Sequence, residues 1–550
     1  MSTEQRILVV GGVAGGASCA ARARRLCETA RIIVFDRGPY VSFANCGLPY
    51  YVGNVILEEK KLLVASAELF MKRFNIEVRT ENEVTAIDRS RREIEVKELP
   101  SGQVYRERYD ALVLSPGAAP VRPPLEGIDL PGIFALRTIP DSRKIREWIV
   151  EKKAQKAVIV GAGFIGLEMA ENLVRRGLSV TLVEMAGQVM PPLDPEMAVP
   201  VREHLTANGI TLQLNHGVAR FEAAPSGQLH VFTHSGKVFP GDLVILAIGI
   251  RPEISLAQVA GLEIGPRGGI RVDASMRTSD PHIWAVGDAV EVRDVVTQEW
   301  NVIPLAGPAN RQGRIAADSI CGREVSFRGV QATSVCGVFG LTVAQTGATE
   351  RSLRRAGRQD FKTVYLHPGH HVGYYPGAKP IHLKLIFSTD GRVLGAQAVG
   401  QEGVEKRIDV IAMAIQKAAT VFDLEEAELC YAPQYGAAKD PVNVAGMIAS
   451  NVLRGDLPVS DWDPVVGDQV VLLDVRDPAE FDSGHVPGAI NIPLGELRER
   501  MEELPRDREI RVYCGVGQRS YYATRALLQY GFNASNLPGG FQTYRAFRGA

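Results

Sequence analysis

One pattern occurs twice along the chain and constrains the fold more than any other feature. An apolar run is followed by a glycine-rich turn, a helical stretch and a second apolar run that ends in an acid, at 7–36 and again at 157–184. Each copy predicts two parallel β-strands joined by a crossover helix, because strand-length apolar runs alternate with a helix-length segment. The sequence therefore predicts an α/β protein with two Rossmann-like βαβ units.

The glycine-rich turns indicate two dinucleotide sites. Such a turn at a helix N-terminus lets backbone N–H groups hold a pyrophosphate, and an acid about 20 residues further on binds the ribose hydroxyls. The residues in these positions are Gly11, Val13, Gly16 and Asp36 in the first copy and Gly161, Gly163, Gly166 and Glu184 in the second. Val13 departs from the pattern, which has glycine there. Glu184 would repel a 2′-phosphate, so we expect NADH as the donor, with NADPH possible if nearby basic groups compensate.

Breaks in the pattern divide the chain into five segments. The runs 112–117 and 243–249 each close one unit, and 283–288 returns to the first sheet. Region 330–450 mixes strands with a long helical stretch, and glycine and proline then mark a linker. The predicted segments are 1–115 with 255–325 for the first nucleotide-binding domain, 116–254 for the second, 326–452 for an α+β domain, 453–463 for the linker and 464–550 for a C-terminal α/β domain.

Composition excludes several classes of function. The formal net charge is −1, which gives no bulk attraction to nucleic acid or to a membrane surface. No run approaches the roughly 20 apolar residues that span a bilayer, and the short apolar run near the N-terminus is no signal-peptide core. We therefore expect a cytoplasmic protein. Seven scattered cysteines contain no CxxC pair, so no metal site is expected either.

Two motifs identify a family resemblance. Cys46 stands in the segment 42–51, soon after the acid of the first unit, and 278–288 resembles the second FAD-binding motif of flavoprotein pyridine-nucleotide disulfide oxidoreductases. That superfamily has its redox-active sulfur at the position of Cys46. The resemblance covers about 5–450 and implies FAD in the first site and a nicotinamide nucleotide in the second. It further implies FAD contacts at Ser115, Gly117, Asp288 and Ala306, and a nicotinamide-nucleotide contact at Gly249.

Cys46 has no partner at the expected spacing. Relatives of glutathione reductase carry a second cysteine five positions on, where this chain has Tyr51. A lone thiolate must store oxidation as a mixed disulfide, a persulfide or a sulfenic acid. The segment 42–51 resembles coenzyme A disulfide reductases, as does the departure at Val13.

By that resemblance, Ser42 and Asn45 flank the sulfur, and Arg22 and Arg25 meet the phosphates of CoA. From the residues alone, the basic cluster on the first helix reads instead as a solvated face.

Two tyrosine motifs in the third region extend the resemblance. The segments 373–376 and 431–435 are similar to motifs in which one tyrosine from each reaches the active site of the other subunit. Tyr374 and Tyr431 stand at the matching positions, so the resemblance implies a homodimer. A phenol there can donate a proton to a departing thiolate. The alternative is that both are core tyrosines with satisfied hydroxyls.

The C-terminal segment resembles a rhodanese domain at 473–493 and again at 512–520. Cys514 follows an apolar strand and stands in a glycine-rich loop that leads into a helix, with Arg519 closing the loop. Successive N–H groups of such a loop form a nest for a thiolate or a persulfide anion. The alternative is a catalytically inactive interaction module.

Together these features predict a flavoprotein that uses NAD(P)H to reduce a persulfide, a polysulfide or CoA persulfide at Cys46, with sulfane sulfur delivered by Cys514. A lowered thiol pKa at Cys46 would assist. The alternatives are plain CoA disulfide reduction, NADH oxidase or peroxidase chemistry through a sulfenic acid, and a non-enzymatic redox sensor or sulfur carrier.

Overall fold

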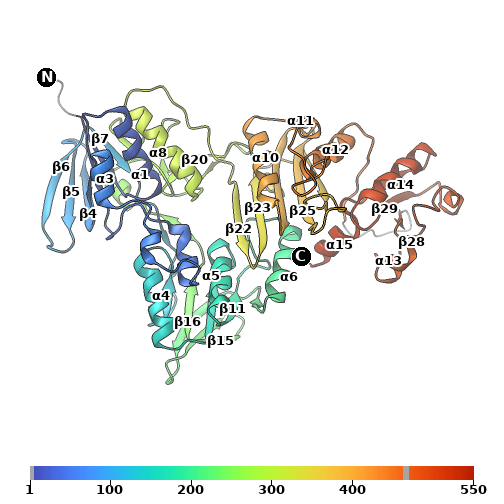
Figure 1. The fold of residues 1–550 in the computed structure, drawn as a ribbon, viewed down its shortest axis with the longest axis horizontal. Helices are drawn as coiled ribbons and strands as arrows, with labels where there is room; N and C mark the ends of the chain where they lie inside the picture. The colour runs from blue at the N-terminus through green and yellow to red at the C-terminus, as the bar shows by residue number, and fades with distance from the viewer. Residues whose placement is uncertain (1–4, 463–469, 550) are drawn as a thin grey trace. The chain divides into compact units, whose positions relative to one another are not determined.

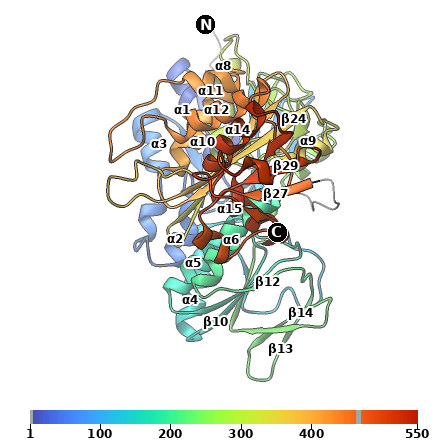
Figure 2. The same ribbon diagram turned by 90° about the vertical axis from the view of Figure 1, so that its right-hand side faces the viewer.

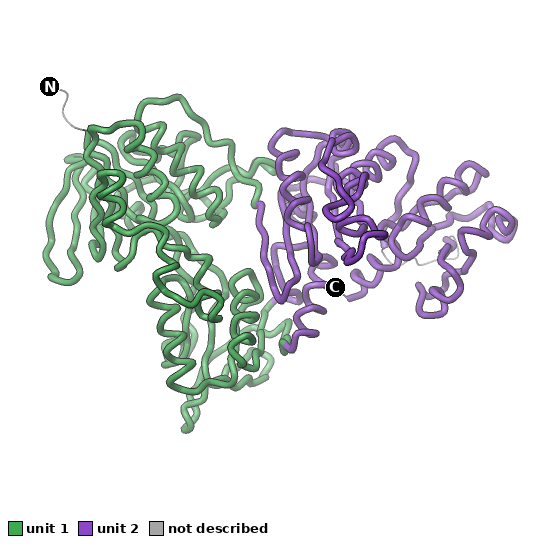
Figure 3. The backbone as a smooth tube through the Cα atoms, viewed as in Figure 1, with its two compact units in different colours: residues 1–185, 210–332 green, residues 186–209, 333–550 purple. Residues whose placement is uncertain are grey.

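The computed structural model describes residues 5–462 and 470–549. The chain forms two compact units, one of residues 1–185 and 210–332 and the other of residues 186–209 and 333–550 (Figures 1 and 3). The predicted mixture of α/β domains with one α+β domain is confirmed. No helix among the described residues is long and apolar enough to cross a bilayer.

The first unit contains a five-stranded sheet built on the first βαβ pattern. Its order is β19-β7-β1-β2-β3, and every neighbouring pair is parallel. The strands β1, β2 and β7 are almost wholly buried, as expected where helices cover both faces of a parallel sheet. The strands are β1 (Arg6–Val10), β2 (Arg31–Phe35), β3 (Glu77–Arg79), β7 (Ala111–Leu114) and β19 (Ile283–Ala285). Two helices pack against one another beside this sheet, α1 (Ala14–Leu26) and α8 (Ala306–Ile320).

The second pattern forms another parallel five-stranded sheet in the same unit, with order β12-β11-β10-β16-β9. Helices α4 and α5 pack against its strands (Figure 2). Its elements are β9 (Ile133–Ala135), α4 (Ile139–Glu151), β10 (Lys156–Val160), α5 (Phe164–Arg175), β11 (Ser179–Val183), β12 (Thr211–Gln213) and β16 (Leu243–Leu246). Both predicted βαβ units are therefore present.

Shorter elements complete the first unit. Three small sheets contain three strands each, and a fourth is a pair. Their strands are β4 (Asn82–Asp88), β5 (Glu93–Glu98), β6 (Val104–Arg108), β13 (Val218–Ala223), β14 (Leu229–Thr233), β15 (Val238–Gly241), β18 (Ile270–Arg271), β20 (Val290–Arg293), β21 (Trp300–Asn301), β8 (Ala118–Pro120) and β17 (Ile250–Pro252). The helices are η1 (Asn45–Gly47), α2 (Leu48–Val52), η2 (Glu59–Leu62), α3 (Ala67–Phe74) and α7 (Ser255–Val259).

An antiparallel five-stranded sheet forms the centre of the second unit, with order β22-β23-β26-β25-β24. Strand β26 is buried throughout and β25 nearly so, because helices cover them. The elements are β22 (Ser334–Val338), β23 (Leu341–Gly347), α9 (Glu350–Arg355), β24 (Phe361–Leu366), β25 (Ile381–Ser388), β26 (Val393–Gly400), α10 (Val404–Gln416), α11 (Val421–Glu426) and α12 (Pro441–Leu453).

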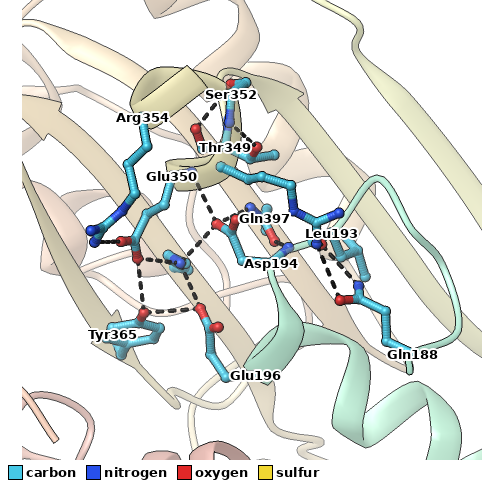
Figure 4. A network of polar contacts seen from close by, with 12 residues as sticks. Gln188, Leu193, Asp194, Glu196, Thr349, Glu350, Ser352, Arg354, Tyr365 and Gln397 are labelled. Atoms are coloured by element: carbon cyan, nitrogen blue, oxygen red, sulfur yellow. Dashed lines mark hydrogen bonds and ion pairs between the residues drawn. The ribbon is translucent and has the colours of Figure 1, made fainter. Parts of the chain in front are cut away.

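Helix α6 (Pro195–Ala207) packs on this sheet, although its sequence lies inside the predicted segment 116–254. A buried polar network fastens it there: the Lys384 ammonium lies 2.8 Å from Asp194 and 2.5 Å from Glu196, with Glu350 at 2.7 Å (Figure 4). The three carboxylates are close enough together to hold a metal ion, but the ammonium stands among them. The Lys384 ammonium therefore neutralises part of the carboxylate charge at this site.

The C-terminal part of the second unit has its own parallel sheet, with order β28-β27-β29-β30. Its elements are β27 (Val470–Asp474), α13 (Pro478–Asp482), β28 (Ile490–Asn491), η3 (Met501–Glu503), β29 (Glu509–Tyr513), α14 (Gln518–Gln529), β30 (Ala534–Asn536) and α15 (Gly540–Gly549). The predicted linker packs on this domain, since the Trp462 indole N–H donates to the Pro538 carbonyl at 2.9 Å. The predicted boundary at 464 lies outside the described residues.

Candidate active site

The first glycine-rich turn is packed so tightly that only glycine fits. Gly11 has φ +93°, and a Cβ added there would lie 2.0 Å from the Ser115 carbonyl oxygen. A Cβ added at Gly16 would lie 1.9 Å from the Gly11 oxygen. The Gly16 N–H donates to Ser115 Oγ at 3.1 Å, and the Gly12 N–H to Asp36 Oδ2 at 3.0 Å. Val13 is the N-terminal cap of α1. The glycine turn therefore lies against both the end of β7 and Asp36, which is the arrangement that a dinucleotide site requires.

The second turn repeats this geometry. A Cβ added at Gly166 would lie 2.0 Å from the Gly161 oxygen, and Ala162 N–H donates to Glu184 Oε2 at 2.8 Å. Gly163 and Gly249 have no heavy atom within 4 Å of such a Cβ, so protein packing does not demand glycine there. Open space at Gly163 lets a ligand approach the backbone closely, which is the role of the middle glycine.

Asp288 connects the first cradle to α8. The preceding Gly287 N–H donates to Gln312 Oε1 at 2.8 Å, on the helix that begins at Ala306. Burial raises the pKa of the Asp288 carboxyl, and the Arg137 guanidinium 3.9 Å away opposes that shift. A Cβ added at Gly117 would come within 2.4 Å of Arg137, so this glycine gives the guanidinium its room. The cradle and its acids fit a flavin dinucleotide.

Cys46 is held close to the first glycine turn by the backbone. It lies in η1, which leads directly into α2. Ser42 has the left-handed φ of +50°, which is uncommon for a residue other than glycine, and its N–H donates to the Gly12 carbonyl at 2.8 Å. The segment that carries the cysteine is thereby tied to the nucleotide cradle.

The groups around Cys46 raise its pKa. The residue is exposed, yet surrounding protein partly desolvates the thiol, and the carboxylates of Glu168 and Asp288 add to the increase. The expectation of a lowered thiol pKa is therefore wrong for the protein groups alone, because both nearby charges are negative. In the preceding residue, Asn45, the Oδ1 atom is buried and has no hydrogen-bond partner among the described residues.

Glu168 was not predicted from the sequence. It stands two positions after Gly166 on α5 and accepts a hydrogen bond of 3.2 Å from the Tyr50 hydroxyl. Burial raises the pKa of this carboxyl to about 7. Its charge therefore changes near neutral pH, within electrostatic range of Cys46.

In the second unit, Tyr374 and Tyr431 form a pair. Their phenolic oxygens lie 2.8 Å apart, and both side chains are exposed. Neither is a core tyrosine, although each hydroxyl has the other as its partner, and a catalytic role for the pair remains a prediction. Tyr435, in the same segment as Tyr431, is exposed as well.

Cys514 lies buried at the end of β29 in the predicted nest. The Gly517 N–H donates to its sulfur at 3.2 Å, and Gly517 adopts φ +101° to turn the loop into α14. Arg519 lies across the loop and pairs bidentately with Glu480, at 2.6 and 2.7 Å. Backbone N–H groups of α15 close the loop from outside, with Phe541 donating to the Cys514 carbonyl at 2.7 Å.

Comparisons with known proteins agree with this geometry. The model of the pyridine nucleotide-disulphide oxidoreductase family matches residues 5–313, and that of the family's dimerisation domain matches 333–440. Coenzyme A disulfide reductase of Staphylococcus epidermidis is 36% identical over 443 residues, which cover 80% of this chain and 99% of that protein. The chain belongs to the pyridine nucleotide-disulphide oxidoreductase family. A rhodanese-like domain matches 462–547.

Two solved structures resemble this family member over almost its whole length. Reduced CoADR-RHD of Bacillus anthracis is 48% identical, with a TM-score of 0.97 over 99% of this chain and 98% of that one. The NAD-dependent persulfide reductase of A. fulgidus is 40% identical, with a TM-score of 0.91 over 98% and 100% of the two chains. The predicted family, its flavin and nicotinamide cofactors, and the C-terminal rhodanese domain are therefore confirmed.

Two predicted CoA contacts lie on α1 of this oxidoreductase. Arg22 donates to Asp318 of α8 at 2.7 and 2.9 Å, so its guanidinium already has a partner, whereas Arg25 is exposed. Their contact with CoA phosphates remains a prediction. Arg137, which lies 3.9 Å from Asp288, had no recognisable sequence pattern, and Glu480 stands in the rhodanese-like segment 473–493 but its pairing with Arg519 was not predicted.

Proposed function

We propose that this oxidoreductase reduces persulfides, polysulfides or CoA persulfide at Cys46, using NADH, and that its rhodanese domain delivers the sulfane sulfur. One observation carries the proposal. A single thiol, without a cysteine five positions on, lies within electrostatic range of Asp288 on a segment hydrogen-bonded to the first glycine turn, while the same chain holds a second thiol in an N–H nest.

Chemistry at Cys46 follows from its isolation. Bound FAD supplies two electrons from NADH to sulfur. The Cys46 thiolate attacks the outer sulfur of a persulfide, the inner sulfur leaves as a thiolate, and a persulfide remains on Cys46. The buried and unsatisfied Asn45 oxygen beside it can accept a hydrogen bond from a substrate. Ser42 and Asn45 would hold CoA near the sulfur, with Arg22 and Arg25 toward its phosphates.

The rhodanese loop suits a sulfur donor. Cys514 would carry sulfane sulfur as a persulfide anion, stabilised by the Gly517 N–H and the positive end of α14. Arg519, held by Glu480, adds a fixed positive charge over the loop. Because Cys514 and Cys46 belong to one chain, the effective concentration for transfer of sulfane sulfur between them would be higher than for two separate proteins.

The active form would be a homodimer, consistent with the matched dimerisation domain. Tyr374 and Tyr431 are exposed on this domain, where they can reach the active site of a second copy. One phenol would donate a proton to the departing thiolate while the other holds it by a hydrogen bond. Glu184, which accepts a hydrogen bond from the Ala162 N–H, would favour NADH over NADPH because its carboxylate would repel a 2′-phosphate.

Plain CoA disulfide reduction is the second candidate, favoured by the likeness to the staphylococcal enzyme over 99% of that protein's length. The two candidates differ in whether Cys514 matters. Steady-state NADH consumption should therefore be measured with polysulfide, with CoA disulfide and with oxygen alone, for the wild type and for Cys46→Ser and Cys514→Ser.

The proposal expects Cys46→Ser to lose both sulfur substrates and Cys514→Ser to lose polysulfide use far more than CoA disulfide use. Equal losses in Cys514→Ser would assign the rhodanese domain a structural role. Rapid turnover with oxygen alone would favour an oxidase, and no turnover with any acceptor would favour a sensor.

A further inference from the structure

Three of the seven cysteines belong to one pair of helices in the first unit. Cys19 lies in α1, Cys27 is the C-terminal cap of α1, and Cys321 is the C-terminal cap of α8. The two helices pack closely, because glycine removes side-chain bulk between them. A Cβ added at Gly313 would lie 2.2 Å from the carbonyl oxygen of Gly15.

The two helices run parallel in a defined register. The Ser18 hydroxyl donates to Asn310, 292 positions further along the chain. About one turn on, Arg22 donates to Asp318, 296 positions further along. Partner positions therefore rise together on both helices.

The same register brings two cysteines opposite one another at the helix ends. The sequence separation between Cys27 and Cys321 lies midway between the separations of 292 and 296 positions in the two side-chain contacts just described. Burial raises the pKa of Cys321, and Cys27 adds to this increase electrostatically, which agrees with the register in bringing the two residues within electrostatic range. Both residues are partly exposed, so reagents in solution can reach them.

Cys19 is different. It is fully buried, and burial raises its pKa far above the ordinary value, with Cys321 adding to the shift. A thiol held protonated and away from solvent is unreactive. The reactive thiols of this cluster are therefore Cys27 and Cys321, at the ends of the two helices.

We propose that Cys27 and Cys321 form a reversible disulfide, a redox-modified site distinct from the catalytic cysteine. The oxidant is a low-molecular-weight disulfide. The Cys27 thiolate attacks one sulfur, which forms a mixed disulfide and releases the first small thiol. The Cys321 thiolate then attacks the Cys27 sulfur, which forms the Cys27–Cys321 bond and releases the second. The protons lost by the two protein thiols go to the two leaving thiolates.

This bond would act on the flavin site. Helix α1 begins directly after the first glycine turn, and α8 begins at Ala306, so the predicted FAD contacts lie at the N-terminal ends of the two helices that the bond joins. A covalent link across a long loop also restricts the unfolded chain. The oxidised form should therefore unfold at a higher temperature and lose FAD more slowly than the reduced form.

The test uses full-length holoprotein carrying Cys46→Ser and Cys514→Ser, so that neither functional thiol consumes the reagent. Reduced protein is treated with oxidised glutathione, free thiols are alkylated, and peptides are mapped without reduction. The expected product is a cross-link between the Cys27 and Cys321 peptides, with a rise of a few degrees in the unfolding temperature.

Matched variants make the result specific. Added Cys321→Ser should abolish the cross-link and leave glutathione on Cys27, while added Cys336→Ser, a buried cysteine of the other unit, should leave the cross-link intact. If Cys321→Ser does not fold, Cys27→Ser takes its place and should also abolish the cross-link. Separate glutathione adducts on both residues, two alkylated thiols, or a cross-link from Cys19 would overturn the proposal.

Discussion

The phenolic oxygens of Tyr374 and Tyr431 lie 2.8 Å apart although 57 residues separate them in sequence. They come from the turn region between β24 and β25 and from the segment between α11 and α12. The hydrogen bond with Tyr374 raises the pKa of Tyr431, so its hydroxyl is protonated at neutral pH. We predict that this exposed pair gives the dimerisation domain a chemical role in addition to association.

Tyr431→Phe should lower kcat with CoA disulfide or polysulfide by roughly 100-fold or more, since a positioned proton donor contributes that much. Tyr435→Phe is the matched control, because it removes a hydroxyl from another exposed tyrosine of the same segment. Equal kcat in the two variants would remove Tyr431 from the chemistry.

A mixed dimer can show which active site the tyrosine serves. One subunit carries Cys46→Ser and the other Tyr431→Phe, each with a different affinity tag. If Tyr431 acts across the interface, one site of the heterodimer has both intact residues, and about half of the wild-type activity returns. Action within its own subunit leaves the heterodimer as inactive as the parents.

Arg519→Lys should lower sulfur transfer by the rhodanese domain, assayed with a small sulfane donor and cyanide as acceptor. Lysine retains the charge but loses the bidentate pairing with Glu480. Charge-assisted hydrogen bonds contribute about 1.5–3 kcal/mol, so a loss of roughly 10- to 100-fold is expected. Arg511→Lys, which breaks a similar pairing with Glu509 away from the loop, should leave transfer near wild type.

Glu168→Gln should increase the reactivity of Cys46. Loss of the carboxylate removes a charge that raises the thiol pKa, so the pH profile of Cys46 alkylation by iodoacetamide should move to lower pH. An unchanged profile would contradict the assigned electrostatic coupling.

The same variant should change the pH dependence of stability. The Glu168 pKa is about 7 in the folded chain against an ordinary 4.5, so the folded state holds a proton that the unfolded state releases. The free energy of unfolding therefore decreases as the pH rises from about 4.5 to about 7, and the whole decrease is present above pH 7. Glu168→Gln should therefore unfold at a higher temperature than wild type at pH 8, and the difference should shrink toward pH 4. Glu171→Gln, which breaks the pair with Arg175, should instead be destabilised.

Lys384→Met should destabilise the second unit strongly. The ammonium is fully buried among Asp194, Glu196 and Glu350, and its removal leaves the buried carboxylates of Asp194 and Glu196 without this cation (Figure 4). Breaking a buried pair costs about 3–5 kcal/mol, which chemical denaturation can measure. Lys362→Met, on the exposed side of the neighbouring strand β24, should change stability by no more than about 0.5 kcal/mol.

Local patterns were enough to predict most of this fold. Apolar runs, glycine spacing and the terminal acids of the two βαβ units depend on short segments. In the structure both acids reach the glycine turns, where the Gly12 N–H donates to Asp36 and the Ala162 N–H donates to Glu184. The placement of α6 was not predictable, because it depends on Lys384, almost 190 residues away from Glu196. Electrostatics at Cys46 were missed for the same reason, since Glu168 approaches the thiol only after folding.

Mass spectrometry of the denatured, unreduced protein after exposure to CoA disulfide tests the central claim most directly. We expect one CoA in mixed disulfide linkage on the peptide that contains Cys46, removed by dithiothreitol and absent from Cys46→Ser. A Cys46 peptide that carries no adduct, together with normal turnover by Cys46→Ser, would contradict the account.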